Sequence, residues 1–171
     1  NAPGCAQAMF LSVPSIPMVK DSAGHGPALS NSLFENNAEY SLGMCLSVDQ
    51  QRNQVKTHAK AALDTTSDAA LKAALESWLQ DGDDGDKTRA VSDALIAALE
   101  KCEQTEDVSY ILENREYLSK KSIWAIGGDG WAYDIGFGGV DHVLASGEDV
   151  NVFVFDTEVY SNTGGQASKA S

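Results

Sequence analysis

The sequence predicts an α/β protein in which a parallel sheet carries a mostly helical insertion, and three features support this. Residues 123–126 and 150–155 are short apolar runs with the length and composition of buried parallel strands. The segment between them has room for one helix, over residues 131–146, which ends at Gly147. Residues 47–120 are rich in helix formers. Strand, helix and strand together have the length of one βαβ unit.

Composition sets the broad class of the protein. The chain has 171 residues, of which 43% are hydrophobic and 22% charged, as expected for one globular domain. Its formal net charge of −13 argues against nucleic acid or an anionic membrane as partner, because phosphate binding draws on clustered Lys and Arg. No apolar run approaches the roughly 18 residues of a membrane span. We therefore expect a soluble intracellular protein, and the start at Asn1 suggests a fragment of a longer chain.

The first 46 residues read as a loop followed by a helix. Prolines and glycines up to Gly26 break regular structure. Pro27 suits the first turn of a helix, which the mixed residues 28–43 would continue.

The helical block at residues 47–120 shows two apolar stripes at intervals of three and four residues. Their members are Leu71, Leu75, Trp78 and Leu79, and then Val91, Leu95, Ile96 and Leu99. The Asp- and Gly-rich residues 81–86 form a turn between them. Ser67 and Asp68 are candidate N-caps for the first helix, and a third helix should follow Thr105.

The residues that carry chemistry follow the two strands. Parallel strands joined by a right-handed crossover end on the same edge of the sheet, so Asp129 and Thr157 should be neighbours. Glycines on both sides of Asp129 let a phosphate approach the backbone while the carboxylate binds a cation. Mg²⁺ takes one or two oxygen ligands from protein and the rest from phosphates and water. The pattern therefore predicts a site for a metal and a diphosphate.

These motifs resemble a known family. Gly128-Asp129-Gly130, followed by Thr157 where many relatives have Asn, is similar to the thiamine-diphosphate signature. Residues 127–136, 141–151 and 156–166 look nearly letter for letter like pyruvate:ferredoxin (flavodoxin) oxidoreductase, and the resemblance extends to residues 26–28 and 31–35. It implies the parallel sheet of the thiamine-diphosphate-binding fold. The chain would be an incomplete domain of that fold: residues 1–46 form a cluster-proximal loop and first helix, residues 47–120 the insertion, and residues 121–171 the metal-diphosphate unit.

The resemblance also implies roles for individual residues. Asp129, Thr157 and the carbonyl of Val159 would bind Mg²⁺, Asn162 would be catalytic beside the substrate, and Cys5 would be a ligand of a [4Fe–4S] cluster. The residues expected to line the cofactor are Gly128, Asp129, Gly130, Trp131, Thr157, Glu158, Val159, Tyr160, Ser161 and Asn162.

The implied reaction is the oxidative decarboxylation of pyruvate with coenzyme A to acetyl-CoA and CO₂, with electrons passing through [4Fe–4S] clusters to ferredoxin or flavodoxin. The enzyme would be a dimer, in the cytoplasm or in a hydrogenosome-like organelle. Two alternatives stay open: the same module within a pyruvate:NADP⁺ oxidoreductase fusion, and a non-catalytic diphosphate-binding domain.

Several residues have plainer interpretations. Cys45 and Cys102 are core or surface thiols, since the three cysteines fit neither a disulfide framework nor a metal site within this chain. Asp134 is expected to be a surface charge, and Trp131 and Tyr160 could line a pocket or simply pack.

Overall fold

The computed structural model describes residues 24, 26, 37–160 and 164–170. The chain divides into two compact units, one formed by Asn1–Cys45 with Ser122–Ser171 and the other by Leu46–Lys121. Each unit has its own hydrophobic core within the described residues. None of the described helices combines the length and the apolar character that crossing a bilayer requires.

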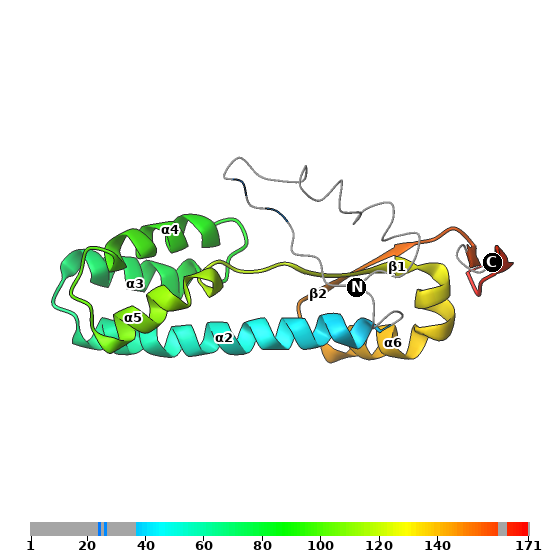
Figure 1. Ribbon diagram of the computed structural model, residues 1–171, viewed down its shortest axis with the longest axis horizontal. Coiled ribbons are helices and arrows are strands. Elements are labelled where there is room, and N and C mark those ends of the chain that lie inside the picture. Colours follow the sequence, from blue (N-terminus) through cyan, green and yellow to red (C-terminus); the bar gives the residue numbers. More distant parts are fainter. Residues whose placement is uncertain (1–23, 25, 27–36, 161–163, 171) are drawn as a thin grey trace. The chain divides into compact units, whose positions relative to one another are not determined.

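The first unit contains the predicted parallel sheet. Strands β1 (Ile123–Gly128) and β2 (Val150–Phe155) pair in parallel, with Ile123 opposite Val150 and Gly128 opposite Phe155. Figure 1 shows the two strands side by side, with helix α6 (Phe137–Ser146) in the connection between them. The α/β class predicted from the two apolar runs is confirmed, and the structure describes a small sheet of two strands here.

One face of this sheet packs on helices and the other is exposed. Buried residues from β1, from the crossover and from the start of α2 (Ala38–Thr65) form a core, whose members are Ala38, Leu42, Ala125, Trp131, Ala132, Val140 and Val143. On the opposite face Trp124 and Phe153 are 49% and 43% exposed. A parallel sheet is usually covered on both faces, so this is a surface onto which further protein can pack.

The crossover between the strands differs from the single helix predicted for residues 131–146. It begins with a π-helix, η3 (Gly130–Ile135), and continues as α6, which ends at Gly147 with a φ of 74°. The break comes at Gly136, where an added Cβ would lie 2.6 Å from Cδ1 of Trp131. Only glycine therefore fits at this position beside Trp131. Short π-helical segments of this kind often occur at functional sites.

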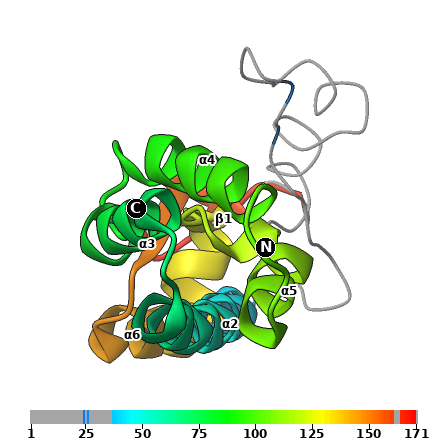
Figure 2. The same cartoon turned by 90° about the vertical axis from the view of Figure 1, so that its left-hand side faces the viewer.

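The second unit is helical. Helices α3 (Ala69–Asp81), α4 (Thr88–Leu99) and α5 (Glu106–Glu113) pack with the later part of α2, and a 3₁₀ turn, η2 (Arg115–Tyr117), follows them. Figure 2 faces this unit and shows α3 and α4 next to each other. Of the two candidate N-caps of α3, Asp68 rather than Ser67 is the cap, and it accepts hydrogen bonds from Ala70 and Leu71. The third helix follows Thr105 as predicted, and Thr105 accepts a hydrogen bond from Val108.

Helix α2 corrects the expected helix boundary near Gly43. The helix passes through Gly43 without a break and runs to Thr65. Its apolar residues belong to two different cores: Ala38 and Leu42 to the first, and Val55, Ala59 and Ala62 to the second. Because no single apolar stripe runs along the helix, periodicity does not indicate one continuous element. The expected start of a helix at residue 28 lies outside the described residues.

A buried arginine ties the helical unit together. The Arg52 side chain is 4% exposed, and its guanidinium donates to the carbonyls of Tyr117, Leu118 and Gly82 and to the carboxylate of Asp83. Lys56 also binds Asp83, and its hydrogen bond, with that from Arg52, holds the pKa of Asp83 below its usual value. The turn predicted at residues 81–86 is thus fixed to α2.

Candidate metal-diphosphate site

Asp129 and Thr157 lie side by side at the edge where β1 and β2 end. The Thr157 N–H donates to Asp129 Oδ2 at 3.1 Å, and Thr157 Oγ1 lies 3.4 Å from Asp129 Oδ1. Because Gly128 pairs with Phe155, the residues after each strand reach the same place. The juxtaposition predicted from the βαβ unit is confirmed.

Three oxygen atoms gather at this edge. Thr157 Oγ1 is 3.3 Å from the carbonyl oxygen of Val159 and 3.4 Å from the Asp129 carboxylate. Adjacent ligands of an octahedral Mg²⁺ are about 3 Å apart, given metal–oxygen distances near 2.1 Å. Asp129 is 2% exposed, and among the described residues no Lys, Arg or His forms an ion pair with it. A buried carboxylate without a cationic side chain beside hydroxyl and carbonyl oxygens suits a hard divalent cation.

Backbone geometry at Glu158 turns the chain between Thr157 and Val159. Glu158 has a φ of 65°, the single positive φ among the described non-glycine residues. Such a conformation is uncommon for Glu and is often kept at functional sites. It lets Thr157 Oγ1 and the Val159 carbonyl approach each other although the residues are two apart. The sequence contains no signal for this conformation.

The Trp131 side chain belongs to the core. It is 3% exposed and packs against Gly127 and Gly136, where an added Cβ would lie 2.6 Å from ring atoms. Its Nε1 is buried without a hydrogen-bond partner among the described residues. Sequence analysis left open whether Trp131 lines a pocket or packs in the core, and the structure shows that its side chain packs in the core. Any contribution of Trp131 to phosphate binding would come from its main chain near the start of η3.

Tyr160 covers Gly130 and lies beside Asp134. An added Cβ at Gly130 would lie 2.6 Å from Cδ1 of the Tyr160 ring, so only glycine fits under it. Burial, together with the neighbouring Asp134, raises the pKa of Tyr160. On the other side of η3, the carboxylate of Asp156 raises the pKa of Tyr133, whose hydroxyl is 3.4 Å away. Both phenols therefore stay protonated at neutral pH and can donate hydrogen bonds.

Asp134 is not the simple surface charge that was expected. Its side chain is 15% exposed, accepts a hydrogen bond from the Lys169 N–H at 3.2 Å, and lies 3.7 Å from Lys169 Nζ. These contacts depend on a hairpin that sequence analysis missed, in which β3 (Val159–Tyr160) pairs antiparallel with β4 (Gln166–Ala167). Gly164 and Gly165, both with positive φ, were the available signal, since paired glycines favour tight reversals.

Comparisons with known proteins find relatives that match nearly the whole of this chain. The chain is 51% identical over 176 residues to "Pyruvate:ferredoxin oxidoreductase" of Moorella thermoacetica and 52% identical over 172 residues to "Pyruvate-flavodoxin oxidoreductase" of Klebsiella pneumoniae. Each match covers 99% of this chain and 15% of the relative. The chain is homologous to a segment of the pyruvate:ferredoxin (flavodoxin) oxidoreductases. It spans about 15% of the length of these curated relatives, and no family model matches it.

A further relative carries a different name. "Pyruvate dehydrogenase [NADP(+)], mitochondrial" of Euglena gracilis is 45% identical over 173 residues, which cover 99% of this chain and 10% of that protein. The segment is therefore shared between pyruvate oxidoreductases whose names specify different electron acceptors.

Three residues with predicted roles lie outside the described residues: the cluster ligand Cys5, the diphosphate neighbour Ser161 and the catalytic Asn162. Their roles stay predictions. Gly128, Asp129, Gly130, Thr157, Glu158, Val159 and Tyr160 are described and come together around the ends of β1 and β2.

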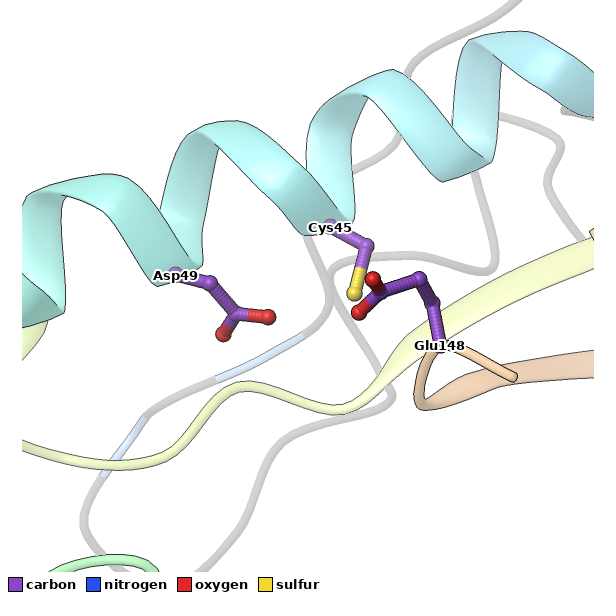
Figure 3. Close-up of side chains that lie close together, drawn as sticks. All are labelled: Cys45, Asp49 and Glu148. Atoms are coloured by element: carbon purple, nitrogen blue, oxygen red, sulfur yellow. The ribbon is translucent and has the colours of Figure 1, made fainter. Parts of the chain in front are cut away.

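Cys45 is a buried thiol, and its Sγ lies 3.8 Å from the carbonyl oxygen of Asp149 in the same unit. Figure 3 shows Cys45 and Asp49 one turn apart on α2, together with Glu148 from the connection between α6 and β2. Asp49 belongs to the helical unit and both acids are exposed. We assign no metal to these side chains.

The close approach of Tyr160 to Gly130 gives a testable expectation. Gly130→Ala should push the Tyr160 ring aside and lower stability by about 1–3 kcal/mol, as overpacking does. Gly138→Ala is the matched control, because an added Cβ there meets nothing within 4 Å. Thermal melts of both variants test this. Equal melting temperatures would contradict the packing of Tyr160 on Gly130.

Proposed function

We propose that this chain binds the Mg²⁺ and diphosphate of thiamine diphosphate within a pyruvate oxidoreductase. The observation that carries the proposal is the group of oxygens from Asp129, Thr157 and Val159 at the carboxyl edge of a parallel sheet. This is the edge at which α/β sheets bind ligands. The similarity to pyruvate:ferredoxin and pyruvate-flavodoxin oxidoreductases supports the substrate class.

The donor set has a specific role in the proposal. Asp129 would provide the anionic ligand, and Thr157 and the Val159 carbonyl would provide neutral ones, leaving positions for diphosphate oxygens. A chain with a net charge of −13 needs a cation to bind a diphosphate at an acidic edge. Gly128, where an added Cβ would meet nothing within 4 Å, would let phosphate oxygens approach main-chain N–H groups before η3.

Once bound, thiamine diphosphate would supply the electron sink for decarboxylation of a 2-oxo acid. The chain's own residues hold and orient the cofactor. The buried Asp129 keeps the cation in place, and the hairpin β3–β4 carries the residues on either side of Asn162. Asn162 would contact the substrate, and Cys5 would bind a [4Fe–4S] cluster whose other ligands lie outside this chain.

The remaining partners also belong to the proposal. Pyruvate and coenzyme A would be the substrates, ferredoxin or flavodoxin the acceptor, and the enzyme a dimer in the cytoplasm or a hydrogenosome-like organelle. The exposed sheet face with Trp124 and Phe153 supports packing against other domains of the same enzyme. The match to a pyruvate dehydrogenase (NADP⁺) supports a second candidate, in which the same module is fused to an NADP⁺-reducing part.

The test uses the full-length protein under exclusion of oxygen. Pyruvate- and coenzyme A-dependent reduction of a viologen dye should require both thiamine diphosphate and Mg²⁺. Reduction of NADP⁺ in place of ferredoxin or flavodoxin would select the fusion enzyme. Mg²⁺-dependent binding of thiamine diphosphate without turnover would make the domain a non-catalytic binder. Absence of binding would overturn the proposal.

A further inference from the structure

No sequence pattern places Ser168 in the candidate site. It directly follows β4 and is 6% exposed. Its Oγ lies 3.4 Å from Asp129 Oδ2, although the two residues are 39 positions apart in the sequence. The return strand of the hairpin thus brings a buried hydroxyl to the carboxylate that the proposed cation needs.

The two oxygens of Asp129 have different surroundings. Oδ2 accepts from the Thr157 N–H at 3.1 Å and from Ser168 Oγ at 3.4 Å, with Thr157 Oγ1 at 3.5 Å. Oδ1 is approached among the described residues by Thr157 Oγ1 alone, at 3.4 Å. Thr157 Oγ1 also contacts the Val159 carbonyl. Oδ2 therefore carries the main-chain and Ser168 contacts, and Oδ1 is the oxygen with fewer protein contacts among the described residues, so it is the one left for a cation.

Ser168 is itself held in a defined orientation. Its N–H donates to the Glu158 carbonyl at 3.2 Å, and its Oγ accepts from the Ala170 N–H at 3.2 Å. Because an ionised carboxylate oxygen can only accept a hydrogen bond, the Ser168 hydroxyl is the donor in its contact with Asp129. The hydroxyl acts as donor to the carboxylate, which is the role of a group that orients a metal ligand.

The two residues that follow β4, Ser168 and Lys169, contact two carboxylates at the two ends of the π-helix. Hydrogen bonds in a π-helix join residues five apart, and Asp129 and Asp134 have this separation at the two ends of η3. Ser168 contacts Asp129, and the next residue, Lys169, binds Asp134 through its N–H and its Nζ. The Lys169–Asp134 contacts therefore fix the register in which Ser168 meets Asp129.

We propose that Ser168 is a positioning residue of the cation site, which holds Asp129 Oδ2 so that Oδ1 faces the metal. This inference rests on the proposed function. Groups that orient a metal ligand typically change metal affinity by about 10- to 100-fold when they are removed. Ser168 acts on the cation only through Asp129.

The experiment measures Mn²⁺ binding, in the presence of thiamine diphosphate, by electron paramagnetic resonance of the full-length protein. Threonine and valine have nearly the same shape and differ in the hydroxyl, so Ser168→Thr and Ser168→Val share any packing cost. Ser168→Val should bind Mn²⁺ about 10-fold more weakly than Ser168→Thr, with similar melting temperatures. Ser168→Ala should weaken binding in the same way without adding bulk.

The outcomes separate this inference from the proposed function. Equal Mn²⁺ affinity of the threonine and valine variants would overturn the role of Ser168. If Asp129→Asn loses Mn²⁺ while Ser168→Ala binds as wild type does, the metal site stands and the positioning role falls. If wild type takes up no Mn²⁺ with thiamine diphosphate, the proposed function itself falls. Exposed Ser77 on α3 provides the neutral control, Ser77→Ala.

Discussion

Replacing Asp129 with asparagine should abolish Mg²⁺-dependent binding of thiamine diphosphate while leaving the fold intact. Asparagine keeps the shape and can still accept the Thr157 N–H bond, but it removes the anionic ligand. Loss of a group that only orients a metal ligand lowers metal affinity by about 10- to 100-fold. Because Asp129→Asn removes the charged ligand itself, we expect Mg²⁺ affinity to fall by more than about 100-fold. Calorimetric titration of the full-length protein with thiamine diphosphate, with and without Mg²⁺, measures the loss.

The same substitution should have the opposite effect on stability without cofactor. Asp129 is 2% exposed, and burying an ionised carboxylate without a cationic partner costs free energy. Asp129→Asn should therefore melt at the same or a higher temperature than wild type when no metal is present. A functional residue that lowers stability is expected where a site is built to receive a cation. Retained Mg²⁺-dependent binding in this variant would contradict the assignment of Asp129.

Replacing Arg52 with methionine should produce the largest loss of stability in the helical unit. The guanidinium donates to three main-chain carbonyls and to Asp83 at 2.6–2.9 Å while the side chain is 4% exposed. Methionine fills similar space but removes the Arg52 donor from the carbonyls of Tyr117 and Gly82, while the Leu118 carbonyl keeps the hydrogen bond from Trp78 Nε1. Leaving a buried acceptor unsatisfied costs about 1–3 kcal/mol. These hydrogen bonds join α2 to the turn after α3 and to η2. Loss of Arg52 should therefore increase local unfolding of α2, of the turn after α3 and of η2.

Hydrogen exchange of amides in α3 and η2 of the full-length protein measures this local stability. Lys56→Met is the matched control. Lys56 binds the same Asp83 carboxylate, but the Asp83 side chain is 61% exposed and the pair lies at the surface, where such pairs contribute about 1 kcal/mol or less. Equal protection in the two variants would show that the buried carbonyl contacts of Arg52 do not stabilise the unit.

Local sequence patterns predicted much of the fold correctly. The two apolar runs predicted both strands, because a short, mainly apolar segment bounded by loop residues is typical of a buried parallel strand. Asp68 and Thr105 predicted the starts of α3 and α5, since capping involves residues two or three apart. The contact between Asp129 and Thr157 could also be predicted, because it follows from the handedness and parallel pairing of one βαβ unit.

The features of the fold that the sequence did not predict depend on contacts between segments that are distant in the sequence. Helix α2 passes from one core to the other, so its single apolar stripe is lost, and the sequence did not predict one helix there. The π-helix over Gly130–Ile135 was not predicted either, because its residues show no local pattern that distinguishes it from an α-helix. The positive φ of Glu158 is maintained by its surroundings against its own preference.

The residues of the candidate site also fall into two groups, those that the sequence predicted and those that only the structure placed there. The sequence by itself determined the metal-ligand candidates Asp129 and Thr157, because they follow two recognisable strands, and the family resemblance implied the Val159 carbonyl. Only the tertiary structure revealed Ser168 and Asp134, since both depend on the reversal between β3 and β4 and on its docking against η3. Strand and cap preferences act over a few neighbouring residues, whereas docking of a hairpin is decided by packing and hydrogen bonds between segments about 35–40 residues apart.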